Sequence, residues 1–139
     1  MITVALLDHA ADAAPMLRLL RDRLDEATFA RRLARAEDQG YRVLAAYDGE
    51  RMVGALGYRL TDDLFWGRSF YVDDLVVDPA RRSAGIGAAL LDHARELAAS
   101  CDHLRLCSGL NRTDAHRFYE ANGMTRFSVQ FITALHGAS

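Results

Sequence analysis

The stretch of the sequence best suited to chemistry is an arginine- and glycine-rich loop between a predicted strand and a predicted helix. Its residues are Arg81-Arg82-Ser83-Ala84-Gly85-Ile86-Gly87, and the apolar run before it ends at Asp78-Pro79. Backbone N–H groups at the start of a helix lack intrahelical partners, and together with the helix dipole they attract phosphate. Gly85 and Gly87 let the main chain approach a ligand closely, and one of the two arginines adds a charged contact. The loop therefore predicts a phosphate site, with a tight turn and close helix packing as the structural alternative.

The elements that must position this loop follow from hydrophobic periodicity and turn residues. Apolar residues three and four apart predict helices, short β-rich runs predict strands, and Asp48-Gly49 between two such runs predicts a hairpin. We expect helices at residues 12–24, 26–39, 86–100 and 113–122, a loop at 61–67, and strands at 2–7, 41–47, 52–60, 70–77, 104–107 and 126–135. This order predicts an α/β fold with one mixed central sheet flanked by about four helices. The N-terminal half of the sheet is antiparallel, and residues 70–107 form a right-handed parallel strand–helix–strand unit.

Length and composition predict a single folded domain spanning residues 1–139. The chain of 15.4 kDa is half hydrophobic and 26% charged, which argues against intrinsic disorder. No apolar run approaches the ~18 residues that span a bilayer, and the opening lacks the basic start of a signal peptide. A net charge of −2 favours neither nucleic acid nor a membrane surface as a partner, so we expect a cytoplasmic protein.

The residue types disfavour several other kinds of site. All 17 basic residues are arginine, and the lack of lysine excludes a Walker P-loop and a lysine Schiff base. Cys101 and Cys107 are interpreted as reduced packing residues, and with His103 between them they match none of the usual zinc spacings, so we expect no metal. A dinucleotide fingerprint requires a third glycine where Leu90 stands. The antiparallel strands expected before the loop also count against a Rossmann domain.

A second motif follows the short predicted strand at 104–107. Residues 111–124 read Asn-Arg-Thr-Asp-Ala-His-Arg-Phe-Tyr-Glu-Ala-Asn-Gly-Met. This block is similar to the Asn-x-x-Ala-x-x-Phe-Tyr-x-x-x-Gly-Phe helix of the GNAT superfamily of acetyl-CoA-dependent N-acetyltransferases. Residues 82–87 look like that family's Arg/Gln-x-x-Gly-x-Gly/Ala loop, and residues 73–79 are similar to its central strand. The resemblance covers essentially the whole chain; it departs at Ser83, where glycine is frequent, and at Met124, where phenylalanine is usual.

The resemblance implies a role for acetyl-CoA as co-substrate and for single residues that would bind it. In the family, main-chain amides of the loop hold the CoA pyrophosphate, and the central strand pairs with the pantetheine arm. Asn111 matches a position that often contacts the pantetheine region, and Tyr119 matches the tyrosine that commonly protonates the departing thiolate. The matching loop and strand residues are Arg82, Ser83, Ala84, Gly85, Ile86, Gly87 and Ala88, and Leu75, Val76 and Val77.

The family's usual base position on the central strand is acidic, and Asp73 or Asp74 occupies it here. An amine is mostly ammonium at pH 7 and must lose a proton before it attacks the thioester carbonyl. A carboxylate takes that proton directly or through water. Adjacent residues of a regular strand face opposite sides, so we expect one of the two aspartates to act and the other to be solvated or bonded to a loop. The alternative for Asp74 is a structural role at a bulge, and the sequence does not rank the two residues.

The acceptor site of the family lies between the N-terminal helices, the loop after the second hairpin strand and the last strand. In this sequence those parts supply acidic, aromatic and polar side chains, namely Phe29, Asp62, Asp63, Phe65, Trp66 and Gln130. Acidic groups beside aromatic rings suit a cationic amine. A polar turn at Asp62-Asp63, with Trp66 covering the edge of the core, explains the same residues without a ligand.

Three classes of function follow from these observations. The first is an N-acetyltransferase that acts on a primary amine of a small molecule or peptide by direct attack in a ternary complex. The second is a non-catalytic acyl-CoA-binding sensor or regulatory protein, which needs neither Tyr119 nor the acidic strand residues. The third, a nucleotide-binding oxidoreductase, is disfavoured by Leu90 and the strand order. Family habit also predicts a homodimer through the last strand.

Overall fold

The computed structural model describes residues 1–82 and 84–136, which fall into two compact units. The first unit, Met1–Leu106, contains the central sheet and its helices. The second unit, Cys107–Ser139, contains helix α4 (Thr113–Ala121). No helix among the described residues is long and apolar enough to cross a membrane.

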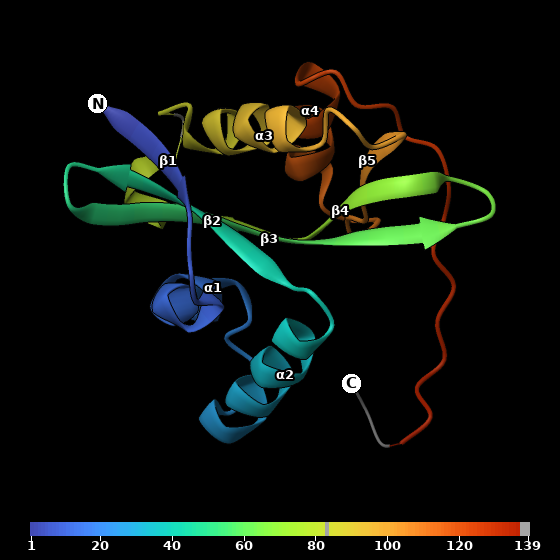
Figure 1. The fold of residues 1–139 in the computed structure, drawn as a ribbon, viewed down its shortest axis with the longest axis horizontal. Helices are drawn as coiled ribbons and strands as arrows, with labels where there is room; N and C mark the ends of the chain where they lie inside the picture. The colour runs from blue at the N-terminus through green and yellow to red at the C-terminus, as the bar shows by residue number, and fades with distance from the viewer. Residues whose placement is uncertain (83, 137–139) are drawn as a thin grey trace. The chain divides into compact units, whose positions relative to one another are not determined.

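The first unit is built on a five-stranded sheet whose spatial order is the order of the strands in the chain (Figure 1). The first three strand pairs are antiparallel and the last pair is parallel, which confirms the predicted mixed α/β sheet. The strands are β1 (Ile2–Leu6), β2 (Arg42–Asp48), β3 (Arg51–Asp63), β4 (Gly67–Val77) and β5 (His103–Leu106).

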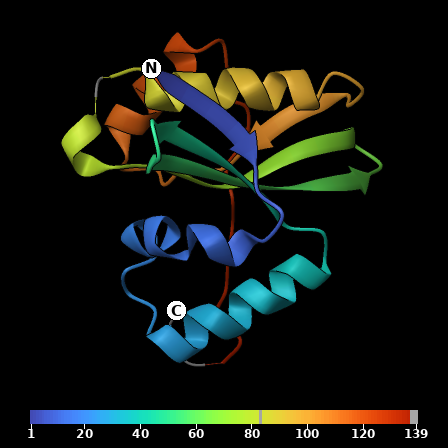
Figure 2. The same ribbon diagram turned by 60° about the vertical axis from the view of Figure 1, so that its left-hand side comes forward.

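Helices cover both faces of this sheet. Figure 2 shows α1 (Ala14–Leu20) against one face, with α2 (Glu26–Asp38) beyond it, and α3 (Ile86–Leu97) against the opposite face. Two short 3-10 helices, η1 (Ala10–Ala13) and η2 (Pro79–Arg81), precede α1 and α3. Gly54 of β3 permits the close approach of α3, because a Cβ there would lie 2.9 Å from Cγ2 of Ile86 and 3.1 Å from the carbonyl oxygen of Val76.

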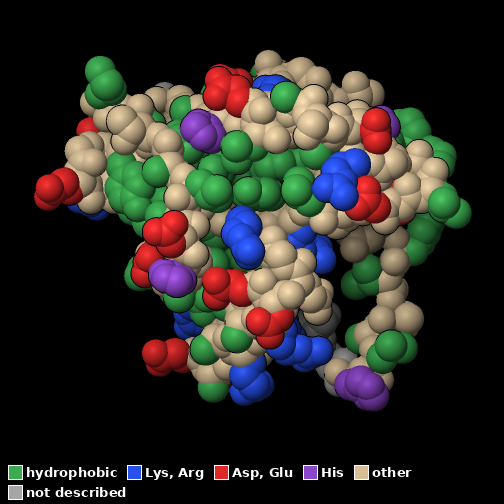
Figure 3. All heavy atoms as spheres, in the orientation of Figure 1, with side chains coloured by type: hydrophobic (Ala, Val, Ile, Leu, Met, Phe, Trp, Pro, Cys, Tyr) green, Lys and Arg blue, Asp and Glu red, His purple; other side chains and the backbone are tan. Residues whose placement is uncertain are grey.

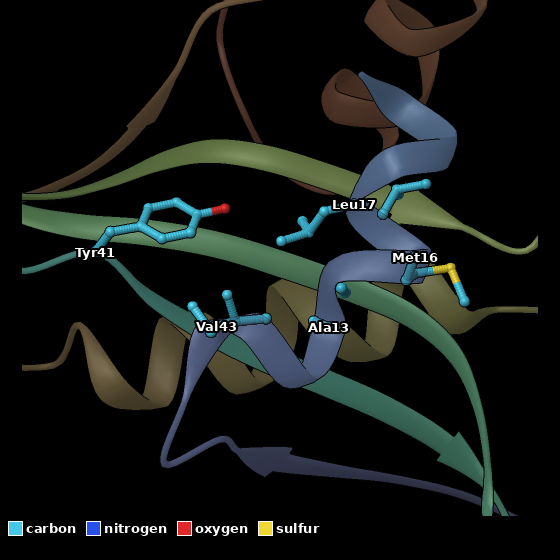
Figure 4. Packing of buried hydrophobic residues seen from close by; sticks show 8 residues of the cluster. Ala13, Met16, Leu17, Tyr41 and Val43 are labelled. Atoms are coloured by element: carbon cyan, nitrogen blue, oxygen red, sulfur yellow. The ribbon is translucent and has the colours of Figure 1, made fainter. Parts of the chain in front are cut away.

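The core beneath α1 is a cluster of small and medium apolar side chains with one tyrosine among them. Figure 4 shows Tyr41, which directly precedes β2, reaching across the sheet toward Leu17 of α1. Tyr41 is only 4% exposed, so its hydroxyl requires a buried hydrogen-bond partner. The other buried members of the cluster are Ala10, Ala13, Met16, Leu17, Val43, Ala55 and Val76.

Three predicted elements differ from the structure. The helix expected at 12–24 ends at Leu20, and Arg18 then donates to the carbonyl oxygen of Leu24, which closes the connection to α2. The loop expected at 61–67 is largely strand, because β3 and β4 continue as one long hairpin to Asp63 and from Gly67. The prediction of a strand at 126–135 was wrong. These residues form no strand, and the described part of the second unit contains no strand with which their backbone groups could pair.

Candidate functional site

A β-bulge in β4 places both predicted base residues at one pocket. Gly57 of β3 lies opposite Asp74, but the next residue, Tyr58, lies opposite Val72, so Asp73 is an extra residue without a cross-strand partner. The expectation that the two aspartates face opposite sides was therefore wrong. The bulge breaks the two-residue alternation of the strand, and both aspartates line the same pocket.

The Asp74 carboxylate accepts three hydrogen bonds from two residues that precede the hairpin. Arg21 donates from Nε (2.9 Å) and Nη2 (2.7 Å) to Oδ1, and the Tyr41 hydroxyl donates to Oδ2 at 2.6 Å. Burial, followed by the charge of Asp74, raises the pKa of Tyr41 far above its ordinary value of 10.0. Tyr41 is therefore a protonated donor at neutral pH, which holds the Asp74 carboxylate in place.

Gly57 makes room for the Tyr41 hydroxyl. A Cβ at this position would overlap the hydroxyl oxygen and the end of the Tyr41 ring. Gly57 is also the residue that lies opposite Asp74 across the β3–β4 ladder. Because Gly57 has no side chain, the Tyr41 hydroxyl can lie against it, close to Asp74 on the opposite strand.

Asp73 forms a two-pronged ion pair with Arg59 of the neighbouring strand β3. Arg59 Nε donates to Oδ2 at 2.8 Å and Nη2 donates to Oδ1 at 2.7 Å. The hydrogen bond to Asp73 is the main cause of a raised pKa of Arg59. Arg21, Tyr41 and Arg59 were not predicted as residues of the site. The one sequence signal for the two arginines is that adjacent aspartates in a chain without lysine need arginine partners, and this signal does not point to Tyr41.

The pocket at these aspartates has a volume of about 590 Å³ and lies within the first unit. Its apolar wall comes from α1, α2 and their connection, namely Leu17, Leu20, Leu24, Phe29, Leu33 and Ala36. Its charged groups are Arg21, Asp22, Arg23, Arg32, Arg59, Asp73 and Asp74. The pocket therefore combines an apolar side with a charged part, whose ion pairs Arg21–Asp74 and Arg59–Asp73 are here called the floor.

Among the predicted acceptor residues, only Phe29 lines this pocket. Asp62 instead pairs with Arg68 across the hairpin, at 2.8 Å and 3.0 Å. Asp63 accepts from the backbone N–H of Trp66 at 2.6 Å and lies 3.6 Å from an Arg105 nitrogen. These hairpin acids are thus held by local partners.

The hairpin aromatics stand apart from the pocket lining as well. The Trp66 ring lies edge-on to His103, with ring centres 5.0 Å apart, and Phe65 is 73% exposed. Gln130 belongs to the second unit, where it is exposed.

The start of α3 carries the features expected of an anion site. Its N-cap is Gly85 with a φ of +79°, and no side chain caps it, whereas Asp25 caps α2 by accepting from the backbone N–H of Thr28. A Cβ at Gly85 would meet nothing within 4 Å, so the approach to this turn is open. The N–H groups of the first turn, at Ile86, Gly87 and Ala88, are those that a phosphate would use.

The two loop arginines have different partners. Arg81 is bound to Asp48 in an ion pair. Arg82 is exposed and makes no ion pair with the described residues, which leaves it, with Ala84, beside the start of α3. Ser83 lies outside the described residues. Arg82 is therefore the arginine of this loop that is available to an anion.

The second half of β4 has a free edge. β5 pairs with β4 only from Ser69 to Val72, and β4 then continues to Val77 with β3 on its other side. Among the described strands none pairs with the outer edge of residues 73–77, which include Leu75, Val76 and Val77. Backbone groups on such an edge accept an extended ligand as an added strand.

The two remaining predicted residues lie in the second unit. Asn111 is exposed in the turn before α4. Tyr119 lies on α4, where burial raises the pKa of its hydroxyl, so the phenol is protonated at neutral pH. Its ring contacts that of Phe118, with ring centres 5.5 Å apart.

Comparisons with known proteins agree with this architecture. Residues 5–124 match the model of the acetyltransferase (GNAT) family. The Bacillus subtilis (strain 168) protein named "Uncharacterized N-acetyltransferase YhdJ" is 35% identical over 112 residues, which cover 78% of this chain and 79% of that protein. A solved structure of ribosomal-protein-alanine N-acetyltransferase from Brucella melitensis biovar Abortus 2308 is 25% identical, with a TM-score of 0.78 over 97% of this chain and 100% of that one. A transcriptional regulator from Bacillus halodurans C-125, 24% identical, has the same fold with a TM-score of 0.81 over 97% and 100% of the two chains.

Proposed function

Because the chain belongs to the acetyltransferase (GNAT) family and is an N-acetyltransferase, we propose that it transfers the acetyl group of acetyl-CoA to a primary amine by direct attack in a ternary complex. The observation that carries this proposal is the free edge of β4 between the bulge and α3. One end of that edge lies at the charged pocket, and the other leads through η2 to the uncapped start of α3. A long, phosphate-bearing thioester fits this path.

The residues of the chain fit CoA at two points. The backbone N–H groups of Ile86, Gly87 and Ala88, with the Arg82 guanidinium, would hold the pyrophosphate. The free backbone edge at Leu75, Val76 and Val77 would bind the pantetheine arm as an added strand, as the family resemblance implies. We assign Asn111 to the pantetheine region on that resemblance. When bound, acetyl-CoA supplies a reactive thioester carbonyl.

The aspartates at the bulge would act on the acceptor amine. All four carboxylate oxygens of Asp73 and Asp74 already accept a hydrogen bond from Arg59, Arg21 or Tyr41. Asp74 Oδ1 takes two bonds from Arg21, whereas the other three oxygens each retain a second lone pair, so either carboxylate can still bind a water. We therefore propose that the ammonium loses its proton through a water held by Asp73 or Asp74. Both carboxylates line the pocket, so either can hold this water.

In the transfer itself, a bond forms between the amine nitrogen and the acetyl carbon, and the bond between that carbon and sulfur breaks. A backbone N–H on the free edge of β4 would stabilise the negative charge that develops on the carbonyl oxygen. The departing thiolate requires a proton. We assign it to the Tyr119 hydroxyl, whose raised pKa keeps it protonated.

The start of α3 offers a substitution that separates ligand binding from folding. Ala88→Asp adds a carboxylate to the first turn, where it favours the helix dipole but repels a pyrophosphate. Ala27→Asp is the matched control, because it adds the same charge to the first turn of α2. We expect calorimetry to detect acetyl-CoA binding in the micromolar range, with no response to NADH. Ala88→Asp should weaken acetyl-CoA binding at least tenfold without lowering the melting temperature, and Ala27→Asp should leave it unchanged.

Thiol release with a panel of amines then tests turnover. Release that depends on an amine supports the enzyme. Binding of acetyl-CoA without release on any amine would favour the non-catalytic sensor instead. If acetyl-CoA produces no heat and no thermal shift, the loop is structural and the proposal fails.

A further inference from the structure

The cations of the pocket are not all paired. Arg21 and Arg59 are committed to Asp74 and Asp73 by the ion pairs described above. Arg23 and Arg32 also line the pocket, yet neither makes an ion pair or a side-chain hydrogen bond with the described residues. The floor of the pocket is thus neutralised internally, while two guanidinium groups are left over.

These two arginines come from different elements that meet at the pocket. Arg23 lies in the connection between α1 and α2, and Arg32 lies on α2 itself. Figure 3 shows basic and acidic side chains intermingled over the α1 and α2 part of the face that it draws. Asp22 is the one acid in the lining that stays outside the two floor pairs, so the unpaired charge of the described lining is positive.

We propose that the acceptor of the reaction carries an anionic group, a carboxylate or a phosphate, which Arg23 and Arg32 bind at this pocket. This inference rests on the proposed N-acetyltransferase function. The apolar side of the pocket, with Leu24, Phe29 and Leu33, takes the body of the acceptor. The substrate class is therefore an amine that also bears an anion and an apolar body, such as an apolar amino acid or an aminoalkyl phosphate.

This proposal reverses the expectation of a cationic acceptor. That expectation depended on Asp62, which pairs with Arg68 of the hairpin, and Asp63, which pairs with Arg105 of β5. A diamine entering the pocket would meet the carboxylates of Asp73 and Asp74, which already bind arginines, the carboxylate of Asp22, and two guanidinium groups that have no carboxylate partner among the described residues. An acceptor with an anion at one end gains charge-assisted hydrogen bonds from those two groups.

Direct binding tests the site without requiring turnover. The probes are 4-methylpentanoate and 4-methylpentanamide, which share an apolar body and differ in charge. We expect the carboxylate to bind at least tenfold more tightly than the amide in calorimetric titrations. Arg23→Gln and Arg32→Gln should each remove most of that difference. Arg35→Gln is the matched control, because Arg35 is an exposed arginine of α2 outside the pocket lining. Equal binding of the two probes, or an equal loss in Arg35→Gln, would overturn the proposal.

Turnover adds a second arm, measured as thiol release from acetyl-CoA. L-leucine is compared with leucinol, and phosphoethanolamine with ethanolamine, so that the pairs separate carboxylate from phosphate. We expect one anionic member to exceed its uncharged partner about tenfold in kcat/KM, and the two arginine variants to lose this preference through KM. A diamine that outperforms all of them would refute the anionic acceptor alone. If acetyl-CoA neither binds nor releases thiol, the proposed function fails, while the binding titration still decides whether the anion site exists.

Discussion

The hydroxyl of Tyr41 offers the sharpest test of how the pocket floor is held. It donates to Asp74 Oδ2 at 2.6 Å, and the side chain is 4% exposed. Tyr41→Phe keeps the ring, and with it the packing against α1, but leaves the carboxylate with Arg21 alone. A hydrogen bond to a charged partner contributes about 1.5–3 kcal/mol, so we expect the free energy of unfolding to fall by that amount at pH 7.

The same variant should change the dependence of stability on pH. In the unfolded chain the pKa of a tyrosine is about 10, whereas burial and the charge of Asp74 raise the pKa of Tyr41 far above that value in the folded protein. The contribution of Tyr41 to the free energy of unfolding is complete below pH 10 and falls as the pH rises above 10. The reason is that the tyrosine hydroxyl then ionises in the unfolded chain but not in the folded protein. The slope approaches ~1.4 kcal/mol per pH unit. Tyr41→Phe removes this slope, so the difference between wild type and variant should shrink above pH 10.

Urea unfolding followed by the fluorescence of Trp66, the only tryptophan, measures both quantities between pH 7 and 11. The control is Tyr47→Phe, which removes a hydroxyl from a half-buried tyrosine of β2, the strand that Tyr41 directly precedes. A loss below about 0.5 kcal/mol at pH 7 would refute the hydrogen bond as a stabilising contact. So would a decline above pH 10 of equal steepness in wild type and Tyr41→Phe.

Two further predictions concern the loop and the general acid. Gly85→Ala and Gly49→Ala should each cost about 1–2 kcal/mol in thermal unfolding, because both glycines have positive φ and neither new Cβ would meet an atom within 4 Å. Only Gly85→Ala should weaken acetyl-CoA binding, and equal affinities in titrations of the two variants would contradict the loop assignment. Tyr119→Phe should lower kcat about 100-fold in the thiol-release assay and leave acetyl-CoA affinity unchanged. Undiminished turnover would remove Tyr119 as the acid.

The sequence predicted the elements whose signals are local. Hydrophobic periodicity, together with the turn and cap residues Gly40, Asp48-Gly49 and Gly85, located most helices and strands within a few residues. These signals suffice because helix caps and tight turns depend on neighbouring residues of one segment. The strand expected at 126–135 had the right alternation, yet a strand also requires a neighbour for its backbone groups, and no local pattern reveals one.

A bulge was one alternative at Asp74, but its register and its ion pairs were beyond local reasoning for the same reason. Asp73 is an extra residue only relative to Gly57 and Tyr58, which lie on another strand. Arg21 stands 53 residues before Asp74 and finds it only through the packing of α1 against the sheet. The positions of charged residues along the sequence therefore do not show which of them form ion pairs in the fold.

The bulge at Asp73 explains why one strand can serve both substrates of the proposed reaction. From Ser69 to Val72, directly before the bulge, β4 pairs with β3 on one side and β5 on the other. After the bulge, β3 is the one neighbour among the described strands, and the open edge leads to the start of α3. A regular strand would turn one of the two aspartates away from the pocket. The extra residue therefore keeps both carboxylates, with their arginines, at the end of the open edge, where an acceptor amine would meet a thioester bound along it.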